Sequence, residues 1–256
     1  MVATQARFSP LYARAYPGGP LVVAGIDQFP GDIWYVDSAA SGAGVTTSHG
    51  RRPEKPFATL SYAFSSDLPT SGDVIVVMPG HTESLAAAGA VTADIAGVKI
   101  VGLGQGAARP TFNFTTTDAT FLVTAASITV ENILTVANTA IDVVAGIVVT
   151  GADFTGIDVE GREDGATKQF VDWLGIGTGG ARAKLIRPKF SGAAGDAGQS
   201  AIQVTAAVAE VFIEDAWAFG TFAAGGIETT AANTNMLING SFTRNSHATQ
   251  DGGIVL

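Results

Sequence analysis

The sequence predicts an all-β fold of the solenoid class, a parallel β-helix. Two observations lead to this prediction: short runs of β-forming residues are separated by small or polar residues, and the same pattern recurs about every 27 residues. No helical pattern of about 10 to 15 residues separates the strand-like runs, which disfavours leucine-rich and helical solenoids. Each repeat is therefore expected to form one coil of two or three short strands.

The repeat is clearest in residues 119–138, which read ATFLVTAASITVENILTVAN. This stretch contains two β-branched runs, 121–124 and 128–130, divided by three small residues, and a third apolar run, 133–136, after a polar pair. Runs of about four β-forming residues with small or polar interruptions are typical of short strands joined by tight bends.

Aligning the chain on Val130 of this repeat gives one anchor residue for each coil. The spacings between anchors are 24, 30, 26, 30, 27 and 25 residues, as expected when turns differ in length while strands stay in register. The anchors are Val76, Ile100, Val130, Gly156, Ile186, Ile213 and Ile238. We predict a β-helix of about seven coils over residues 73–256.

The composition fits one elongated domain with a narrow interior. Of the 256 residues, 46% are hydrophobic, mostly small and β-branched, and 32 are glycine, which indicates many tight turns. The formal net charge of -9 argues against a nucleic acid or an anionic membrane as partner. Cysteine is absent, which excludes disulfides and thiolate metal sites. No apolar signal-peptide core is present near the N-terminus, so we expect release by a route other than secretion.

Residues 1–30 are predicted to form an extended arm. They contain four prolines and several aromatic residues without a helical or strand period. The arm either folds on a partner or packs along the flank of its own domain. Its candidate partner-binding residues are Arg7, Phe8, Leu11, Tyr12, Arg14 and Tyr16.

Residues 31–72 are predicted to cap the first coil. A strand in residues 31–37 is followed by a loop that reaches Pro56, and an amphipathic helix then begins just after this proline. Its apolar face contains Phe57, Leu60, Phe64 and Leu68. A short helix at this place would cover the open apolar end of the stack.

The order of four motifs in residues 31–114 is familiar: GDIWYVD, then RRPEKPFATLSYAF, then SGDVIVVMPGHTESL and AGVKIVGLGQGAARPTFNF. It resembles the opening of right-handed parallel β-helix proteins of the pectin-lyase-like superfamily, in particular structural proteins of tailed-phage virions. The resemblance implies a single-stranded right-handed parallel β-helix solenoid, with the short N-terminal capping helix and the extended arm added to it. These motifs specify fold more than function, because lyases, hydrolases, tailspikes and non-enzymatic particle proteins share them.

The glycine-rich stretch GLGQG contains Gly102, Gly104 and Gly106. A dinucleotide fingerprint places such glycines between a strand and a helix, whose N-terminus then faces the pyrophosphate. Here Arg109, Pro110 and a strand-like run follow, so we interpret the stretch as a turn between coil faces.

Polysaccharide-cleaving β-helices need paired carboxylates, or carboxylates that hold calcium beside a basic residue. On one strand, Asp158 and Glu160 would point to the same face, about 6 to 7 Å apart at the backbone. They are the candidate catalytic pair, and the competing interpretation is solvated surface charge. The acidic residues of this stretch are Asp153, Asp158, Glu160, Glu163 and Asp164.

Other chemistry has little support in the sequence. Trp34 belongs to the cap, whereas Trp173 and Trp217 either stack a carbohydrate or cover a turn. Three histidines lie far apart along the chain, so neither a metal site nor a cofactor is predicted, and His81 is expected to make a structural hydrogen bond. No G-x-S-x-G motif and no cysteine nucleophile are present.

These observations favour a non-enzymatic structural protein of a phage virion, a capsid decoration or head-fibre component. We expect it on the particle surface, anchored through residues 1–30 to the major capsid protein or another virion protein. The resemblance implies a homotrimer, and neither a nucleic acid nor a membrane is expected as partner. The alternatives are a tailspike-like depolymerase that uses Asp158 and Glu160 as acid and base, and a carbohydrate-binding particle protein that uses Trp173 and Trp217.

Overall fold

The computed structural model of the chain describes residues 12–13, 22–23, 31–138, 142–165, 169–193, 198–205, 207–230, 232, 235–247 and 253–255. The chain divides into two units, Met1–Pro30 and Gly31–Leu256. In the first unit, β1 (Tyr12–Ala13) and β2 (Val22–Val23) pair antiparallel. The other predicted arm contacts, Arg7, Phe8, Leu11, Arg14 and Tyr16, lie outside the described residues.

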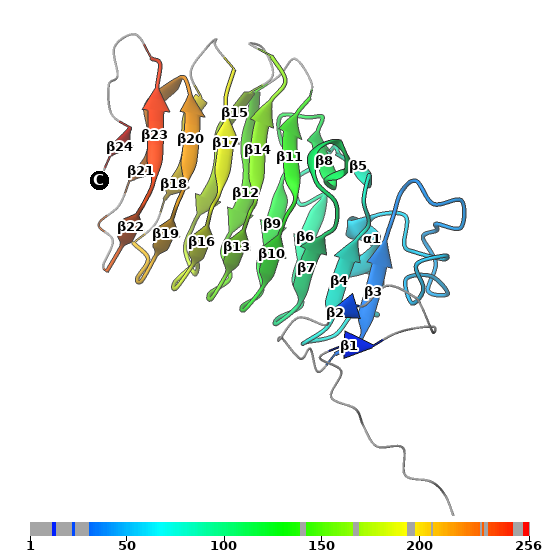
Figure 1. Cartoon of the computed structure of the whole chain (residues 1–256). Coiled ribbons are helices and arrows are strands. Elements are labelled where there is room, and N and C mark those ends of the chain that lie inside the picture. Colours follow the sequence, from blue (N-terminus) through cyan, green and yellow to red (C-terminus); the bar gives the residue numbers. More distant parts are fainter. Residues whose placement is uncertain are drawn as a thin grey trace, which may run out of the picture. The chain divides into compact units, whose positions relative to one another are not determined.

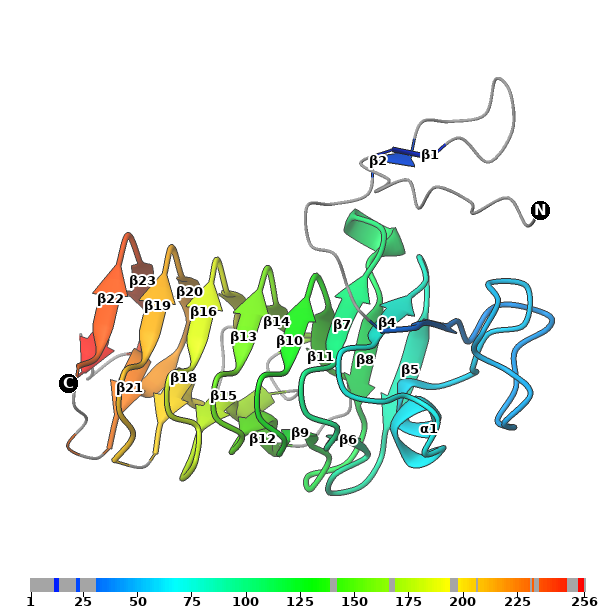
Figure 2. The same cartoon turned by 90° about the horizontal axis from the view of Figure 1, so that it is seen from below.

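The unit Gly31–Leu256 is a right-handed parallel β-helix with three sheets (Figures 1 and 2). The first sheet contains β3 (Ile33–Val36), β4 (Val74–Val77), β7 (Lys99–Gly102), β10 (Thr129–Glu131), β13 (Thr155–Ile157), β16 (Lys184–Ile186), β19 (Phe212–Glu214) and β22 (Leu237–Asn239). The second contains β5 (Thr82–Leu85), β8 (Thr111–Phe114), β11 (Leu134–Ala137), β14 (Glu160–Glu163), β17 (Lys189–Ser191), β20 (Trp217–Gly220) and β23 (Phe242–Asn245). The third contains β6 (Val91–Ala93), β9 (Phe121–Val123), β12 (Asp142–Val149), β15 (Gln169–Ile176), β18 (Gly198–Val204), β21 (Phe222–Thr229) and β24 (Ile254–Val255).

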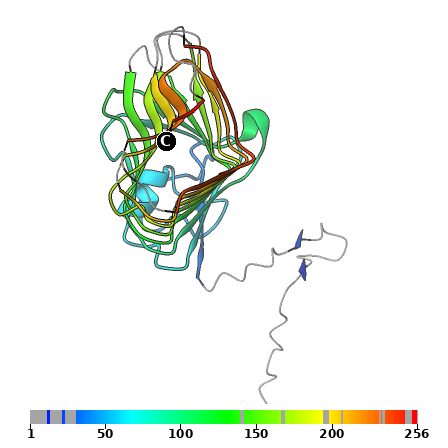
Figure 3. The ribbon, with the colours of Figure 1, turned by 90° about the vertical axis from the view of Figure 1, so that its left-hand side faces the viewer.

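Each coil contributes one strand to each sheet, and every pair within these sheets is parallel. The three runs recognised in residues 119–138 are β9, β10 and β11, which confirms the predicted repeat. Seen along the stack, successive coils superimpose around one interior (Figure 3). No helix in the part of the chain described here is long and apolar enough to span a membrane.

The register of the first sheet corrects two of the predicted anchors. Val130 pairs with Ile100, which pairs with Ile75 rather than Val76. Gly156 pairs with Leu185 rather than Ile186. Ile75 and Leu185 are fully buried, whereas the two predicted anchors are half-buried. Because side chains alternate along a strand, each one-residue slip exchanges an inward position for an outward one.

The interior contains more aromatic side chains than the composition suggests. Phe114 contacts Phe170, which contacts Phe190, with ring centroids 5.2 and 6.4 Å apart. Phe190 in turn contacts Phe222 at 5.8 Å, so this row contains rings from four different coils. Glycines on the neighbouring strands lie against aromatic rings of the interior, where a larger residue would not fit. At Gly161, an added Cβ would collide with the indole of Trp173.

The first coil is covered by α1 (Leu60–Ser65), which is shorter than predicted. Thr59, not Pro56, sets its start, because the amide of Tyr62 donates to the Thr59 hydroxyl at 3.0 Å. Phe57 is therefore outside the helix, where it stacks on Trp34 at 5.6 Å. Leu60, Ala63 and Phe64 face the interior, as a cap requires.

A buried His–Glu pair fastens this helix to the second sheet. Glu83 accepts hydrogen bonds from the amides of Leu60 at 2.7 Å and Ser61 at 3.2 Å. His81 Nδ1 accepts from the amide of Ser38, so its Nε2–H is the group that faces Glu83, at 3.3 Å. His81 is fully buried and makes the structural hydrogen bonds expected of it.

The glycine-rich stretch is a turn, as predicted. Gly104 and Gly106 have φ of 97° and 58°, values that favour glycine. Only a single turn of 3-10 helix, η1 (Gly106–Ala108), precedes β8. Three residues offer no helix N-terminus long enough to hold a pyrophosphate.

Candidate functional site

A column of left-handed residues turns the chain from the first sheet to the second and places the candidate site. We call it the corner column: it holds one residue per coil at the same register position, with φ between 51° and 60°. Its members are Asn132, Asp158, Arg187, Asp215 and Gly240. The amide of Asp158 donates to the carbonyl of Ile186 at 3.0 Å, and that of Arg187 to Glu214 at 2.8 Å. The left-handed backbone thus bonds each coil to the next and projects the side chains as a row.

A second column precedes each strand of the first sheet by two residues, and we call it the entry column. Its non-glycine members have φ between 57° and 62°. They are Ser127, Asp153, Arg182, Glu210 and Asn235. Asn and Asp tolerate this conformation best, which accounts for some of these residue types, but Arg and Glu do not. Alternation of charge explains the Arg and Glu residues better. In the same three coils, each column has an acidic, then a basic, then an acidic residue.

Both arginines form two-bonded pairs with the aspartate one coil before. Arg187 donates through Nε and Nη2 to Asp158 at 2.7 and 2.6 Å, and Arg182 donates likewise to Asp153 at 2.6 and 2.7 Å. The hydrogen bond from Arg182 holds the pKa of Asp153 below its usual value. Hydrogen bonding to Asp158 raises the pKa of Arg187, and the charges of Asp215 and Glu214 add to this effect. In both columns, an arginine–aspartate ion pair therefore joins the coil of Asp153 and Asp158 to the next coil.

Glu160, the first residue of β14, lies beside the corner column and is buried under basic side chains. Arg109 Nη1 lies 2.5 Å from its Oε2, Arg162 Nε lies 2.6 Å from its Oε1, and Lys189 Nζ lies 3.9 Å from Oε1. Arg109 Nε also donates to Asn132 Oδ1 at 2.8 Å. Asn132 in turn donates to the carbonyls of Gly102 and Gly104, so the network fixes the turn that precedes β8.

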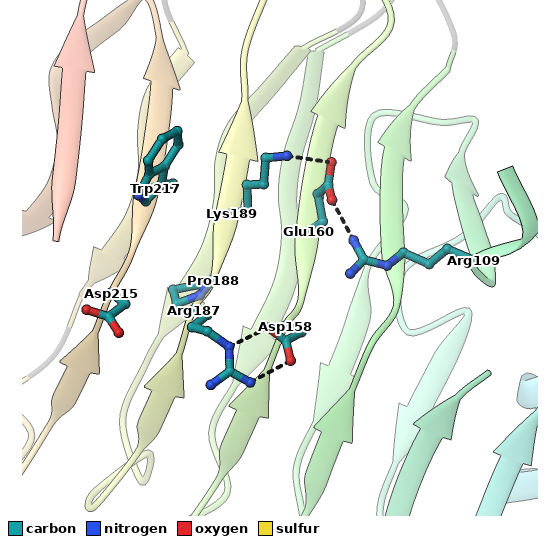
Figure 4. Close-up of a pocket in the computed structure, with 8 residues that line it drawn as sticks. All are labelled: Arg109, Asp158, Glu160, Arg187, Pro188, Lys189, Asp215 and Trp217. Atoms are coloured by element: carbon teal, nitrogen blue, oxygen red, sulfur yellow. Dashed lines mark hydrogen bonds and ion pairs between the residues drawn. The ribbon is translucent and has the colours of Figure 1, made fainter. Parts of the chain in front are cut away.

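The predicted acid–base pair does meet in one hollow, but for a different reason from the one expected. Asp158 and Glu160 are not alternating residues of one strand, because Asp158 has φ of 52° and the chain turns there into the second sheet. Figure 4 shows them on either side of this corner, each turned toward a cation. The hollow measures about 300 Å³ and is lined by Arg109, Asp158, Glu160, Arg187, Pro188, Lys189, Asp215 and Trp217. A second, of about 680 Å³, continues it over β7 and β10.

This geometry does not suit general acid–base catalysis. A general acid must hold a proton near the working pH, and apolar surroundings or a neighbouring carboxylate usually raise its pKa for that purpose. The oxygens of Asp158 and Glu160 are instead each paired with arginine side chains, those of Arg187, Arg109 and Arg162. No group of three His, Asp or Glu side chains that could hold a metal ion occurs among the residues with described positions.

The two candidate carbohydrate-stacking residues lie in opposite environments. Trp173 is fully buried, and its Nε1–H donates to Thr135 Oγ1 at 2.7 Å, so its prediction as a surface platform is wrong. Trp217 is 51% exposed and lines the 300 Å³ hollow. Only Trp217 can meet a ligand at the surface.

Comparisons with known proteins assign neither a family nor an activity to this chain. No protein-family model matches the sequence. No curated protein matches it either. Among solved structures, a rhamnogalacturonan lyase is similar over 88% of this chain and 63% of its own, with a TM-score of 0.48 and 13% sequence identity. This chain spans less than two thirds of that enzyme's length, and we carry no activity over from it.

Two carboxyl groups near the third sheet have raised pKa values, which the sequence analysis did not predict. Burial raises the pKa of Glu163 to about 7, against the hydrogen bonds that it accepts from the amides of Ala193 and Phe170. Burial likewise raises the pKa of Asp172 to about 6, and the charge of Glu228 adds to the effect. Asp172 sits between Val171 and Trp173 in an apolar strand, and this was the available signal. Perturbed carboxyls occur at functional sites and in structural networks alike.

These two groups predict that the protein gains stability as the pH falls from 8 toward 5. The folded protein holds a proton on Glu163 up to about pH 7, whereas the ordinary value for glutamate is 4.5. Folding therefore takes up protons in this window, and stability is lost as the pH rises through it. We expect the free energy of unfolding, measured by urea denaturation, to be larger at pH 5.5 than at pH 8 by about 2 kcal/mol.

Glu163→Gln and Asp172→Asn provide the check, because neither side chain can titrate. The double variant should have nearly equal stability at the two pH values. If the variant keeps the full pH dependence of the unaltered protein, other groups are responsible and the assignment is wrong.

Proposed function

We propose that this protein is a non-enzymatic structural component of a phage particle, either a capsid decoration or a head-fibre protein. It is a rod that attaches to the major capsid protein or another virion protein through residues 1–30, on the particle surface and as a homotrimer. The motifs GDIWYVD and DVIVVMPGHTE, which resemble those of virion β-helices, support the class of particle. The partner and the trimer rest on that resemblance.

One structural observation carries the non-enzymatic part of the proposal. Both carboxylates of the candidate catalytic hollow are engaged by basic side chains: Asp158 by Arg187 of the next coil, and Glu160 by Arg162 of its own strand and by Arg109, which lies two coils away. Both oxygens of each carboxylate are paired with guanidinium groups, which fits a structural role better than a catalytic one. The alternative, a depolymerase with Asp158 and Glu160 as acid and base, would need one of these carboxylates released from its arginine.

Particle binding and sugar release, measured in parallel, test the proposal. Purified protein is incubated with particles that lack it and with the host surface polysaccharide, and co-sedimentation and new reducing ends are scored. We expect saturable binding to particles and no reducing ends above the blank. Sugar release that Asp158→Asn or Glu160→Gln abolishes would overturn the non-enzymatic assignment in favour of the depolymerase.

The arm is tested by replacing its aromatic residues in the full-length chain. Phe8→Ala, Tyr12→Ala and Tyr16→Ala together should weaken particle binding at least tenfold, since aromatic anchors dominate most protein interfaces. The thermal unfolding temperature should not change if these side chains serve a partner. Unchanged particle binding would count against anchoring by the arm, and lowered stability would show that the arm packs on its own domain.

A further inference from the structure

The last residue of the corner column, Gly240, differs from the others in the state of its backbone amide. In each earlier coil, the amide of the corner residue donates to a carbonyl of the next coil, at 2.8 to 3.0 Å. The amides held in this way are those of Asn132, Asp158, Arg187 and Asp215. Gly240 follows β22, which is the last strand of the first sheet (Figure 1). Its amide donates no hydrogen bond within the described part of the chain, so the nitrogen is accessible to solvent base.

The residue before Gly240 carries the group that a free backbone amide can attack. Asn239, the last residue of β22, is exposed, and its side chain makes no hydrogen bond to any other described residue. Asparagine is among the chemically labile residue types. Asn239 is the only asparagine in the sequence that is followed by glycine. Because glycine has no Cβ, nothing shields the Gly240 nitrogen from the side-chain amide beside it.

We propose that Asn239 is a site of spontaneous deamidation. The Gly240 nitrogen loses its proton to a base in solution and attacks Cγ of Asn239. The new C–N bond closes a cyclic succinimide, and the side-chain nitrogen takes up a proton and leaves as ammonia. Water then adds to one of the two ring carbonyls and breaks its bond to the ring nitrogen, which leaves either aspartate or isoaspartate. The reaction consumes one water, releases one ammonia and needs no oxidant, metal or enzyme.

Both products place a new carboxylate beside existing negative charge. Asn239 pairs with Glu214 of β19, and the carboxylate of Asp215 lies against Gly240, where an added Cβ would collide with it. Like charges at directly paired positions weaken the pairing of two strands. Isoaspartate also lengthens the backbone by one methylene group, next to the carbonyl that accepts from the Asp215 amide at 2.9 Å. The modification therefore loosens the coil of β22 and leaves the earlier coils intact.

Asn245, in the next strand of the same coil, provides a matched control. It is followed by another small residue, Ser246, but the Ser246 amide donates to the carbonyl of Gly220 at 2.8 Å. The side chain of Asn245 accepts from the amide of Phe222 and donates to its carbonyl, both at 2.9 Å. The attacking nitrogen and the side-chain amide are thus both held at Asn245, whereas both are free at Asn239.

Incubation of the full-length protein at pH 8 and 37 °C tests the proposal, with peptide mapping by mass spectrometry and labelling by an isoaspartyl methyltransferase as readouts. We expect conversion at Asn239 to be at least about tenfold faster than at Asn245, because the hydrogen bonds of Asn245 must open first. The rate should rise in proportion to the hydroxide concentration, since the deprotonated amide nitrogen is the nucleophile. Asn239→Gln should abolish the labelling at this position, because glutamine closes its larger ring far more slowly. Amide hydrogen exchange of the converted protein should show lost protection at residues 237–245 and unchanged protection at residues 121–137.

Three outcomes would overturn the proposal. One is conversion at equal rates at Asn239 and Asn245, which would show that the reaction takes place in the unfolded chain. Another is a folded protein that stays intact at Asn239 while a free peptide of residues 235–243 is converted, because the pairing of β22 would then protect the site. The third is unchanged exchange protection at residues 237–245 after conversion, which would contradict the loosening of this coil.

Discussion

Replacing Trp173 with alanine should cost this protein about 3–5 kcal/mol of its free energy of unfolding, the usual loss when a large aromatic is removed from a core. The side chain is fully buried, its indole rests on Gly161 without room for a Cβ, and its ring centroid lies 5.4 Å from that of Phe190. Removing it also takes a hydrogen-bond donor from Thr135, itself fully buried. Urea denaturation followed by far-ultraviolet circular dichroism measures the loss.

Trp217→Ala is the matched control for this prediction, because the same change is made at a surface position. It should alter the free energy of unfolding by less than about 1 kcal/mol. Trp173→Phe should fall between the two, since it keeps most of the apolar volume and loses the hydrogen bond. Equal stabilities for Trp173→Ala and Trp217→Ala would contradict the burial on which the prediction depends.

Removal of the Glu83 carboxylate should be about as damaging, about 3–5 kcal/mol, because it leaves buried donors without an acceptor. Glu83→Ala strands the amides of Leu60 and Ser61 and the Nε2–H of His81. Glu83→Gln should restore little, since its amide group presents donors to a site that already has three. We expect α1 to detach first, and amide hydrogen exchange should show lost protection at residues 60–65 before the coils exchange.

Glu131→Gln supplies the comparison. Glu131, unlike the buried Glu83, lies at an outward position of its strand; its carboxylate lies 2.9 Å from Lys99 Nζ, and about a third of its side chain is exposed. An ion pair of this kind contributes less than about 1 kcal/mol. If Glu83→Ala is no less stable than Glu131→Gln, or if exchange at α1 does not change, the helix is not held by Glu83.

The repeat was readable in the sequence because it depends on local residue types. Residues 119–138 show three β-forming runs, and the structure has three strands there. The register was less secure. In VIVV, residues 74–77, every residue is β-forming, so residue type alone does not distinguish Ile75 from Val76. The pairing across coils decides which one faces inward. The start of α1 depended on a cap by Thr59, which an apolar stripe does not reveal.

The site was less predictable than the fold, because its contacts join distant coils. Arg109 reaches Glu160 across 51 positions, a distance that can be guessed only when the length of every turn is known. Trp173 illustrates a second reason why the site could not be predicted from the sequence. Strict alternation would place either Trp173 or Leu174 at the surface, yet both are fully buried, because the strand departs from alternation there. Trp217, in a regular strand, alternates with the fully buried Ala216 and the buried Ala218.

The charges of the corner and entry columns limit how a β-helix of this kind can lengthen during evolution. In three successive coils both columns read acidic, basic, acidic. Duplication of the coil that contains Asp153 and Asp158 would set like charges one coil apart in both columns at once. Duplication of that coil together with its arginine-bearing neighbour would preserve the alternation. Growth of this segment is therefore favoured in steps of two coils. This preference comes from the surface charges and not from the packing of the core.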